Sequence, residues 1–461
     1  MKYLAYKEYK DSGVDWLGEI PNHWMSTELK RYSVVQGGYA FSSDSFIDAG
    51  KAVIRIGDIK QDGSVSLESC KYIKIENADQ YSQYQVNNGD LLMAMTGATI
   101  GKAGWFKENE PALLNQRVGS FKCNRIYLNY KFFWYVLNSS GYQEYIKITA
   151  FGGAQPNISD SGMVGYQSAF PRENEQTKIA SFLDHETAKI DTLIEKQQQL
   201  IKLLKEKRQA VISHAVTKGL NPNASMRDSG VEWLGEVPEH WEAVPLKYLC
   251  NFSGGGTPSK DNLSYWTGGD IPWVSPKDMK SFWVSDTQDK LTDTAVKESS
   301  TNFVDCGALL MVVRSGILQR TIPIAINTVR VTLNQDMKAL KFNSRLNVEY
   351  AANYILGNVG SLLLEWSKEG ATVESIEQEY LSNSIFPVPP IEEQIEINES
   401  IKLQMDIFQD VEIRAIRGIS LLQERRTALI SAAVTGKIDV RNWQAPEPSH
   451  RNKETQQEAT A

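Results

Sequence analysis

The chain has 461 residues, of which 41% are hydrophobic and 23% charged, a length that predicts two to four globular domains. No run of about 18 apolar residues predicts a membrane span, and the first ten residues lack the apolar core of a secretory signal. The four cysteines are far apart and form no Cys-x-x-Cys pair, which argues against a disulfide framework or a zinc site and favours a reducing cytoplasm. Taken alone, the net charge of −7 argues against nucleic acid as a partner.

The sequence is an internal duplication with an offset of 217 residues. Residues 11–24 read DSGVDWLGEIPNHW and residues 228–241 read DSGVEWLGEVPEHW, so eleven of fourteen positions are identical. The offset then drifts by only two or three residues along each copy. Such a repeat predicts two copies of one structural module. Further matching pairs are LNQ at 114–116 and 333–335, PRENEQ at 171–176 and PPIEEQ at 389–394, and LLKEKRQAVISHAVT at 203–217 and LLQERRTALISAAVT at 421–435.

Each copy is predicted to hold a mixed α and β domain of about 145 residues, a common domain size. Short apolar runs bounded by Gly and Asp predict strands at 52–56, 91–95, 309–313 and 321–326, whereas 130–137 and 350–356 predict helices. In chain order the expected segments are an N-terminal strap at 1–24, a first domain at 25–175, a long helix at 176–218, a linking strap at 219–241, a second domain at 242–390, a second long helix at 391–436 and a disordered polar tail at 437–461.

The strap segments (1–24 and 219–241) are expected to be structural. Their Asp-Ser-Gly sequence favours a turn, and their Trp and Leu side chains favour burial. We therefore expect each strap to dock on a helix end, with His23 and His240 in structural roles.

The two long segments predict helices of about 40 residues, or ~60 Å at 1.5 Å per residue. A single apolar stripe of that length needs a partner, and the other copy is the simplest one. The expected fold class is thus α+β, a tandem duplication whose two helices pack as an antiparallel coiled coil with pseudo-twofold symmetry. The heptad positions expected to pack are Ile190, Leu193, Gln197, Leu200, Leu204, Lys207 and Val211, and then Ile401, Met405, Phe408, Val411, Ala415, Leu422 and Leu429.

Motifs for catalysis are missing from the sequence. None of the five histidines stands in a zinc-protease or nucleophile motif. The segment 97–103, GATIGKA, has three residues between its glycines where a phosphate-binding loop needs four, and Ala follows the Lys. We read it as a glycine turn between strands and expect no catalytic residue, no metal site and no cofactor in this chain.

A duplicated chain without catalysis favours a ligand of matching symmetry, and duplex DNA has two antiparallel strands. Because the two domains have diverged, the two half-sites should differ in sequence. The local charge gives this idea little support, since residues 25–170 carry a net charge of +1 and residues 242–388 a net charge of −3.

The layout strongly resembles the specificity subunit of type I restriction-modification systems over nearly the whole chain. Two domains each precede a spacer helix, and several motifs occur in the family's order. These motifs are the DSGVEWLGEVPEHW type of opening, SGGGTPS at 253–259 followed by YW at 265–266 and GDIPWV at 269–274, the Pro-x-x-x-Glu-Gln start of each helix, and the Ala-Val-Thr-x-Gly or Ala-Val-Thr-Gly helix ends.

The resemblance implies a cytoplasmic, non-catalytic subunit that reads a bipartite, asymmetric site in double-stranded DNA, one half-site for each target recognition domain. It implies that the helices set the spacing and dock two modification (methyltransferase) subunits, with restriction or translocase subunits as further partners. S-adenosylmethionine, ATP and Mg²⁺ belong to those partners, which carry out adenine-N6 methylation and cleavage.

Candidate DNA contacts are side chains that can read base edges or hold phosphates near the glycine turns. The recurring pairs Asn115-Gln116 and Asn334-Gln335 are expected to support the fold instead, because the two domains should read different sequences. In the first domain the candidates are Tyr39, Ser42, Arg55, Lys60, Thr96, Lys102, Arg117, Gln155 and Asn157. In the second domain they are Thr257, Ser259, Lys260, Ser275, Lys277, Arg314, Ser315, Gln319 and Arg320.

Two other functions remain open at this point. The acidic balance favours a coiled-coil scaffold that binds proteins at both ends and reads no DNA sequence. An enzyme with an unrecognised site is the third hypothesis, and the lack of any correctly spaced motif counts against it.

Overall fold

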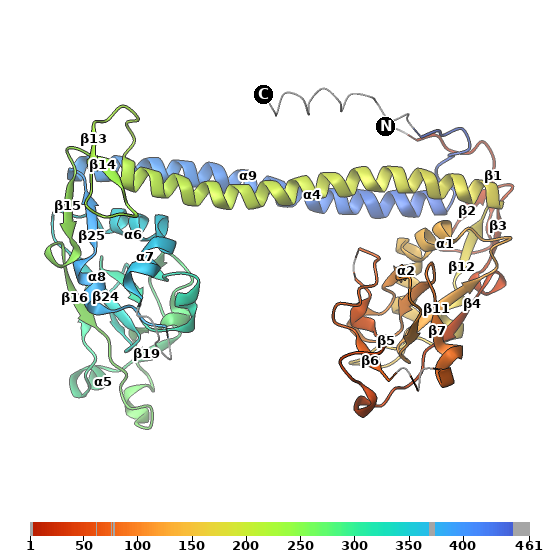
Figure 1. Cartoon of the computed structure of the whole chain (residues 1–461), viewed down its shortest axis with the longest axis horizontal. Helices are drawn as coiled ribbons and strands as arrows, with labels where there is room; N and C mark the ends of the chain where they lie inside the picture. The colour runs from red at the N-terminus through yellow and green to blue at the C-terminus, as the bar shows by residue number, and fades with distance from the viewer. Residues whose placement is uncertain (1–2, 61, 75, 77–78, 368–373, 446–461) are drawn as a thin grey trace. The chain divides into compact units, whose positions relative to one another are not determined.

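The computed structural model describes residues 3–60, 62–74, 76, 79–367 and 374–445 (Figure 1). The chain forms two compact units, of which unit 1 comprises Met1–Gln197 with Arg417–Ala461 and unit 2 comprises Gln198–Ile416. Each unit holds one globular domain, one strap and one segment of each long helix. None of the helices in the described ranges is long and apolar enough to span a membrane.

The domain of unit 1 is built on two four-stranded sheets, with strand orders β6-β5-β10-β7 and β4-β11-β8-β9. β5 and β10 are parallel, and the other neighbours in these sheets are antiparallel. The pairs β1-β2 and β3-β12 are separate. The strands are β1 (Tyr9–Asp11), β2 (Glu19–Pro21), β3 (Met25–Glu28), β4 (Ser33–Gly37), β5 (Lys51–Ile54), β6 (Lys71–Ile73), β7 (Gln85–Val86), β8 (Leu91–Ala94), β9 (Ala103–Trp105), β10 (Ala112–Leu114), β11 (Val118–Cys123) and β12 (Gln167–Phe170).

The domain of unit 2 repeats this plan with a five-stranded sheet, β16-β24-β21-β22-β18, and a four-stranded sheet, β19-β17-β23-β20. The pairs β13-β14 and β15-β25 correspond to β1-β2 and β3-β12. The strands are β13 (Met226–Asp228), β14 (Glu236–Pro238), β15 (Glu242–Pro245), β16 (Cys250–Gly254), β17 (Ile271–Val274), β18 (Trp283–Val284), β19 (Asp289–Leu291), β20 (Phe303–Val304), β21 (Leu309–Val312), β22 (Ile324–Asn327), β23 (Val331–Leu333), β24 (Met337–Phe342) and β25 (Ile385–Val388).

Short helices complete each domain and cover its apolar core. Asn129 caps α1 and Asn347 caps α6, each through hydrogen bonds from two backbone N–H groups to the side-chain oxygen. The helices predicted at 130–137 and 350–356 and the four predicted strands are confirmed, with small shifts at their ends. The short helices are α1 (Tyr130–Leu137), α2 (Ser140–Thr149), α3 (Asp160–Val164), α5 (Asp293–Glu298), α6 (Val348–Gly357), α7 (Val359–Trp366) and α8 (Gln378–Asn383).

The long helices are α4 (Glu173–Lys218) and α9 (Ile391–Val434). Helix α4 begins three residues before the predicted boundary at 176, directly after Pro171 and Arg172. Glu173 and Glu175 stand in its first turn, where negative charge is favourable. The two helices contact each other within each unit. Arg426 Nε donates to Asp191 Oδ1 at 2.9 Å in unit 1, and Arg208 Nη1 lies 3.2 Å from Glu412 Oε2 in unit 2.

The predicted packing face of α4 is wrong at alternate positions. Ile190 and Leu204 are buried as expected, but Leu193 and Leu200 are 47% and 37% exposed. Apolar residues spaced alternately by three and four, or by four and three, both repeat every 3.5 residues on average. The apolar spacing alone therefore did not distinguish the two possible packing faces. The less exposed positions are Ile190, Ile194, Gln197, Ile201, Leu204, Arg208 and Val211, whereas the face predicted for α9 is buried or half-buried throughout.

Each strap docks on a helix start through one glutamate, as predicted. In unit 1, Glu175 Oε2 lies 2.8 Å from His23 Nε2, and Glu175 Oε1 accepts from Trp24 Nε1 at 3.2 Å. In unit 2, Glu393 makes the same two contacts with His240, at 2.8 Å, and Trp241, at 3.1 Å. The carboxylate therefore explains why the repeat retains His-Trp at the end of each strap.

The glutamine that follows each of these glutamates ties the domain to the helix. Gln176 is buried, accepts from Asn129 N at 2.9 Å and donates to the carbonyl oxygens of Tyr127 and Pro171. Gln394 repeats this set, accepting from Asn347 N at 2.8 Å and donating to the carbonyl oxygens of Arg345 and Pro389. The residues bonded are those just before α1 and α6, so the Glu-Gln pair joins strap, domain and helix.

The tail predicted to be disordered at 437–461 is packed over its first part. Ile438 and Val440 are buried, and Trp443 packs edge-on against Phe182 with ring centroids 5.5 Å apart. These apolar residues pack on unit 1. The prediction of disorder failed for them because it was based on the polar composition of the rest of the tail. Residues 446–461 lie outside the described residues.

Replacing the buried glutamine should destabilise unit 2. Gln394→Ala removes three hydrogen bonds and leaves one N–H and two carbonyl groups unpaired, so the free energy of unfolding should fall by about 2–4 kcal/mol. Urea denaturation followed by tryptophan fluorescence measures this change. Gln423→Ala on an exposed part of α9 is the control and should change stability by less than about 0.5 kcal/mol. Equal effects of the two substitutions would contradict this role of Gln394.

Candidate nucleic-acid interface

In unit 1, three other segments bond to the turn of residues 115–117, between β10 and β11, or to Leu114 just before it. Tyr39 N donates to Leu114 O at 2.8 Å, and Gln116 N donates to Tyr39 O at 2.9 Å. Asn115 N donates to Ile54 O at 3.0 Å, and Met95 N donates to Arg117 O at 2.9 Å. The backbone thereby gathers four of the predicted side chains, those of Tyr39, Arg55, Thr96 and Arg117, around one turn.

A fifth predicted residue, Asn157, lies beside Thr96 and comes from the loop that follows α2. It pairs with Thr96 as an isolated bridge, and it also closes its own loop through two backbone hydrogen bonds with Phe151. The loop carries Gln155, which is exposed. Lys102 lies at the end of the turn that joins β8 to β9, so the segment 97–103 is the glycine turn between strands that the sequence predicted.

Unit 2 builds the same backbone arrangement around the turn of residues 334–336. Gly256 N donates to Leu333 O at 2.9 Å, Asn334 N to Val274 O at 2.9 Å, and Val313 N to Asp336 O at 2.8 Å. Arg314 forms an isolated bridge with Ser375, as Thr96 does with Asn157. Thr257, Ser275 and Arg314 therefore gather here, and Thr257 Oγ1 donates to Gln335 Oε1.

Glycine is required where the two backbones approach each other. A Cβ atom on Gly38 would lie 2.2 Å from Asn115 O, and one on Gly255 would lie 1.9 Å from Asn334 O. Both distances are far below ordinary van der Waals contact. The turns at 115–117 and 334–336, each with its glycine neighbour, are called here the Asn-Gln turns. The asparagines support this frame, as expected: Asn115 Oδ1 accepts from Arg117 N at 3.4 Å and Asn334 Oδ1 from Asp336 N at 3.0 Å.

The side chains around the two Asn-Gln turns differ in charge and size, although the backbone is shared. Thr96 of unit 1 stands where unit 2 has Arg314, two residues after β8 and β21. Arg117 is replaced by Asp336 at the end of the turn. The two arrangements thus present different hydrogen-bonding groups on one frame.

Several predicted residues are held by local contacts instead. Arg55 Nη2 donates to Ser69 O at 3.0 Å, and Lys60 Nζ donates to Gly57 O at 3.4 Å. Ser42 caps the short 3₁₀ turn that follows it. No contact between Ser42 or Lys60 and the Asn-Gln turn is found within the described residues, so the structure does not group these two with the others.

Unit 2 also contains predicted residues that are already engaged. Ser275 is buried, and its hydroxyl donates to Asp278 Oδ2 at 2.7 Å. Lys277 Nζ donates to Asp289 Oδ2 at 2.6 Å, a hydrogen bond that raises the pKa of this lysine. Ser259 O accepts from Trp266 Nε1, and Lys260 lines a cavity with that ring.

The helical turn after Arg314 carries the remaining three predicted residues. Ser315 N donates to Glu374 O at 3.1 Å, and Gln319 Nε2 donates to Glu374 Oε1 at 3.4 Å. Arg320 ends the 3₁₀ helix Gly316–Gln319 and is exposed. Ser315 and Gln319 thus lie beside the segment that contains Ser375.

The prediction missed four residues that the fold brings to these sites. Ser375 and Glu374 come from a segment without a recognisable motif, and Gln335 was assigned to the fold alone. Asp160 lies beside Gly37, and burial raises the pKa of its carboxyl group. Among these, only Gln335 had a usable signal, since the Leu-Asn-Gln sequence recurs in both copies.

The described residues contain no group of three or more His, Cys, Asp or Glu side chains arranged to hold a metal ion. All four cysteines lie in the described ranges and are free thiols. The two sites are therefore arrays of hydroxyl, amide and charged groups on a rigid frame, which is the chemistry that base edges and phosphates need.

The family model for the type I restriction modification DNA specificity domain matches residues 21–203 and 238–406, which include both Asn-Gln turns. The chain belongs to this family. It contains the specificity domain twice, and the resemblance seen in the sequence is confirmed. Each match begins at the end of a strap and extends into a long helix.

Curated relatives carry the same description. The EcoR124I/EcoR124II specificity subunit of Escherichia coli is 39% identical over 178 residues, which cover 38% of this chain and 41% of that protein. This chain thus aligns with about two fifths of the length of that relative. The EcoBI specificity subunit of Escherichia coli is 24% identical over 460 residues, covering 96% of this chain and 92% of that protein.

Solved structures share the fold. A chain from a structure on complex assembly and conformational transition of the type I R-M system matches with a TM-score of 0.69 and 15% identity, covering 91% of this chain and 99% of that one. The HsdS subunit from Thermoanaerobacter tengcongensis matches with a TM-score of 0.55 and 15% identity, covering 91% and 98%. The tandem mixed α and β fold is therefore common to these proteins.

The close approach at the Asn-Gln turn can be tested with two adjacent glycines. Gly255→Ala places a Cβ against Asn334 O. We therefore expect the free energy of unfolding to fall by at least about 2 kcal/mol, as at other overpacked sites. Gly254→Ala is the matched control, because a Cβ there meets nothing within 4 Å. Calorimetry of both variants measures the difference. If the two variants melted alike, the frame would not depend on Gly255.

Proposed function

We propose that this chain is the DNA sequence-specificity subunit of a type I restriction-modification complex, each domain reading one half of a bipartite site. The observation that carries the proposal is the shared frame of the two Asn-Gln turns with different side chains around it. One backbone arrangement holds a reading surface in each domain, and its side chains decide which bases fit. Membership of the specificity family supports the same conclusion.

The long helices are proposed to form an antiparallel coiled coil with pseudo-twofold symmetry, which sets the distance between the half-sites. The direction of contacts inside unit 1 supports this. In unit 1, Arg426 donates to Asp191 and Lys178 donates to Arg441 O. Lys178 precedes Asp191, whereas its partner Arg441 follows Arg426, so the two segments run in opposite directions. At 1.5 Å per residue, the 46 residues of α4 span ~69 Å, an upper limit for the separation that the helix can set.

Catalysis is proposed to reside in partner proteins. Two modification subunits would dock on the helices and supply S-adenosylmethionine and adenine-N6 methylation, and restriction or translocase subunits would supply ATP- and Mg²⁺-dependent chemistry. The complex would act in the cytoplasm, where it meets DNA. Since the net charge is −7, this chain should bind DNA weakly alone and more tightly with its partners.

The proposed DNA-contacting groups lie at or near the Asn-Gln turns, and of those gathered there Thr96 is included, whereas Arg55 and Ser275 already have local partners. Arg314 of unit 2 and Arg117 of unit 1 are exposed and can donate two hydrogen bonds to guanine. Asn157 and Gln155 can pair with adenine, and Thr257 with either a base or a phosphate. Contacts with the nearby DNA backbone are proposed for Tyr39, Lys102, Ser315, Gln319 and Arg320. For Ser42, Lys60, Ser259, Lys260, Ser275 and Lys277 local structural contacts are the simpler role.

Exchange of one domain tests the two-reader proposal. Replacing residues 25–170 by the corresponding domain of another specificity subunit should change one half of the methylated site and leave the other half and the gap unchanged. Methylation of a random-sequence DNA library by the assembled complex measures both halves. A change in both halves, or in neither, would overturn the proposal. Tight assembly without sequence preference would instead support the coiled-coil scaffold.

A single substitution in unit 2 also tests whether each domain reads its own half-site. Arg314→Ala should weaken binding of the cognate site by about 1–3 kcal/mol and relax sequence preference only in the half-site read by unit 2. Competition binding with DNA altered in either half-site measures the effect. Arg31→Ala, an exposed arginine remote from the Asn-Gln turns in sequence, is the control and should leave both preferences intact. Loss of preference in the other half-site would show that the assignment of domains to half-sites is wrong.

A further inference from the structure

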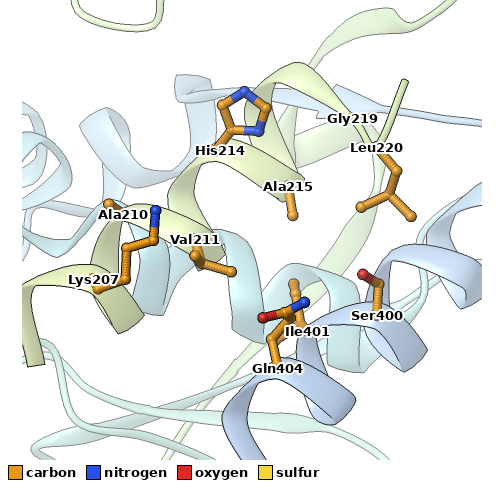
Figure 2. A pocket seen from close by; sticks show the side chains of 10 residues that line it. All are labelled: Lys207, Ala210, Val211, His214, Ala215, Gly219, Leu220, Ser400, Ile401 and Gln404. Atoms are coloured by element: carbon orange, nitrogen blue, oxygen red, sulfur yellow. The ribbon is translucent and has the colours of Figure 1, made fainter. Parts of the chain in front are cut away.

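Unit 2 contains an open cavity of 540 Å³ between the end of α4 and the first turns of α9 (Figure 2). Its apolar wall includes Val211, Ala215 and Ile401, and Leu220 extends into the opening with 45% of its surface exposed. Polar groups stand around this wall. The described residues that line the cavity include no Phe, Tyr or Trp, and the polar ones are Lys207, His214, Ser400 and Gln404.

The duplication shows what occupies the same place in unit 1. Aligned through the repeat, Ser400 corresponds to Phe182, Gln404 to Glu186, and Lys207 to Arg425. These three counterparts surround Tyr3. The Tyr3 ring packs edge-on against Phe182 with centroids 5.3 Å apart, and its hydroxyl donates to Glu186 Oε2 at 3.0 Å.

Arg425 and Trp443 complete the contacts of that tyrosine pocket. Arg425 lies near the Tyr3 phenol and lowers its pKa, although burial and Glu186 together raise that pKa above its usual value. Trp443 covers the other edge of Phe182, with centroids 5.5 Å apart. The pocket of unit 1 is therefore filled by two aromatic side chains, each with a polar group available at its edge.

Chain connectivity explains why unit 2 lacks these rings. In unit 1 two separate segments reach the helix ends, the one before β1 and the one after α9, and they are joined by the hydrogen bond from Asp439 N to Leu4 O. In unit 2 a single continuous segment, residues 219–225, connects α4 to β13. One segment replaces two, and its sequence GLNPNAS contains no aromatic residue. The space that Tyr3 and Trp443 fill in unit 1 is thus left open.

We propose that the cavity of unit 2 binds a segment of a partner polypeptide that carries a tyrosine or tryptophan side chain. The ring would pack on Val211, Leu220 and Ile401, whereas Tyr3 packs against Phe182 and the core of unit 1. Gln404 can accept a hydrogen bond from a phenol or an indole, as Glu186 does in unit 1, and Lys207 stands where Arg425 does. Aromatic side chains with one polar edge are the groups most enriched where proteins meet.

The proposal makes the chain asymmetric in its protein contacts. The pocket of unit 1 is occupied by Tyr3 and Trp443 of the same chain, whereas the corresponding cavity formed by the described residues of unit 2 is open. A partner that uses it would bind with a stoichiometry of one for each chain. The proposal does not rest on DNA recognition, because the cavity and its filled counterpart are observed directly.

The test uses a peptide with the sequence of residues 1–8, MKYLAYKE, in which Tyr3 is replaced by 3-fluorotyrosine. Fluorine NMR of the peptide titrated with the full chain should show saturable binding of one peptide for each chain, with a Kd on the order of 0.1–1 mM. Leu220→Trp should abolish binding, because its indole fills the cavity from the exposed edge. Gln404→Glu, which restores the acceptor found in unit 1, should tighten binding at least threefold.

The two variants act in opposite directions, so impaired folding cannot mimic the expected pair of results. Glu186→Gln in unit 1 is the matched control and should leave the affinity unchanged. Absence of saturable binding, or binding insensitive to both Leu220→Trp and Gln404→Glu, would overturn the proposal. So would sensitivity to Glu186→Gln, because the peptide would then be displacing Tyr3. Self-association that Leu220→Trp abolishes would identify a second copy of the chain as the occupant and also overturn it.

Discussion

The structure depends on a single glutamate-glutamine pair at the start of each long helix. Glu175 and Glu393 each bind the His-Trp end of a strap, and Gln176 and Gln394 bind the backbone just before α1 and α6. One turn of helix therefore fixes strap and domain together through Glu and Gln side chains that are buried or half-buried. A buried polar group is stabilising only when its partners are all in place, so this junction holds one geometry.

On that junction each domain builds a rigid frame around its Asn-Gln turn. The close approach of glycine to the asparagine carbonyl fixes the backbone, whereas the side chains around it are free to diverge. Unit 1 offers Thr96 and Arg117 where unit 2 offers Arg314 and Asp336. A duplicated frame with different side chains is the economical way for one chain to read two different half-sites. The duplication also leaves two unlike pockets. Tyr3 and Trp443 fill the one in unit 1, whereas the corresponding cavity in unit 2 is open.

Much of the architecture followed from the sequence because a repeat within one chain carries its own alignment. The strap, the helix starts and the glycine turns recur in order, and each has a physical requirement that the structure bears out. The packing face of α4 did not follow, because steps of three-four and four-three have the same average spacing. The structure separates them by exposure, since Leu193 and Leu200 are exposed whereas Ile194 and Ile201 are half-buried. The order of residues 437–443 was missed because three apolar residues stand in a polar stretch.

The glycine turns that form the backbone frame of the candidate site could be predicted from the sequence. The side chains that belong to the site were predicted less well. Thr96, Arg117, Asn157, Thr257 and Arg314 were candidates because of their side-chain chemistry, and the fold places them at or beside the Asn-Gln turns. Ser375 was missed because only its pairing with Arg314 marks it, and that contact joins segments 61 residues apart in the sequence. Lys277 was included because it is basic, yet its charge is already paired with Asp289. Charge and spacing alone do not report which polar groups are already satisfied.

The most direct measurement is a genome-wide map of N6-methyladenine in the host, with and without the gene for this chain. The account predicts that one methylated motif disappears with the gene, and that this motif has two unlike halves separated by a gap of fixed length. A methylation pattern that is unchanged, or a lost motif that is contiguous or palindromic, would contradict two different readers on one duplicated frame.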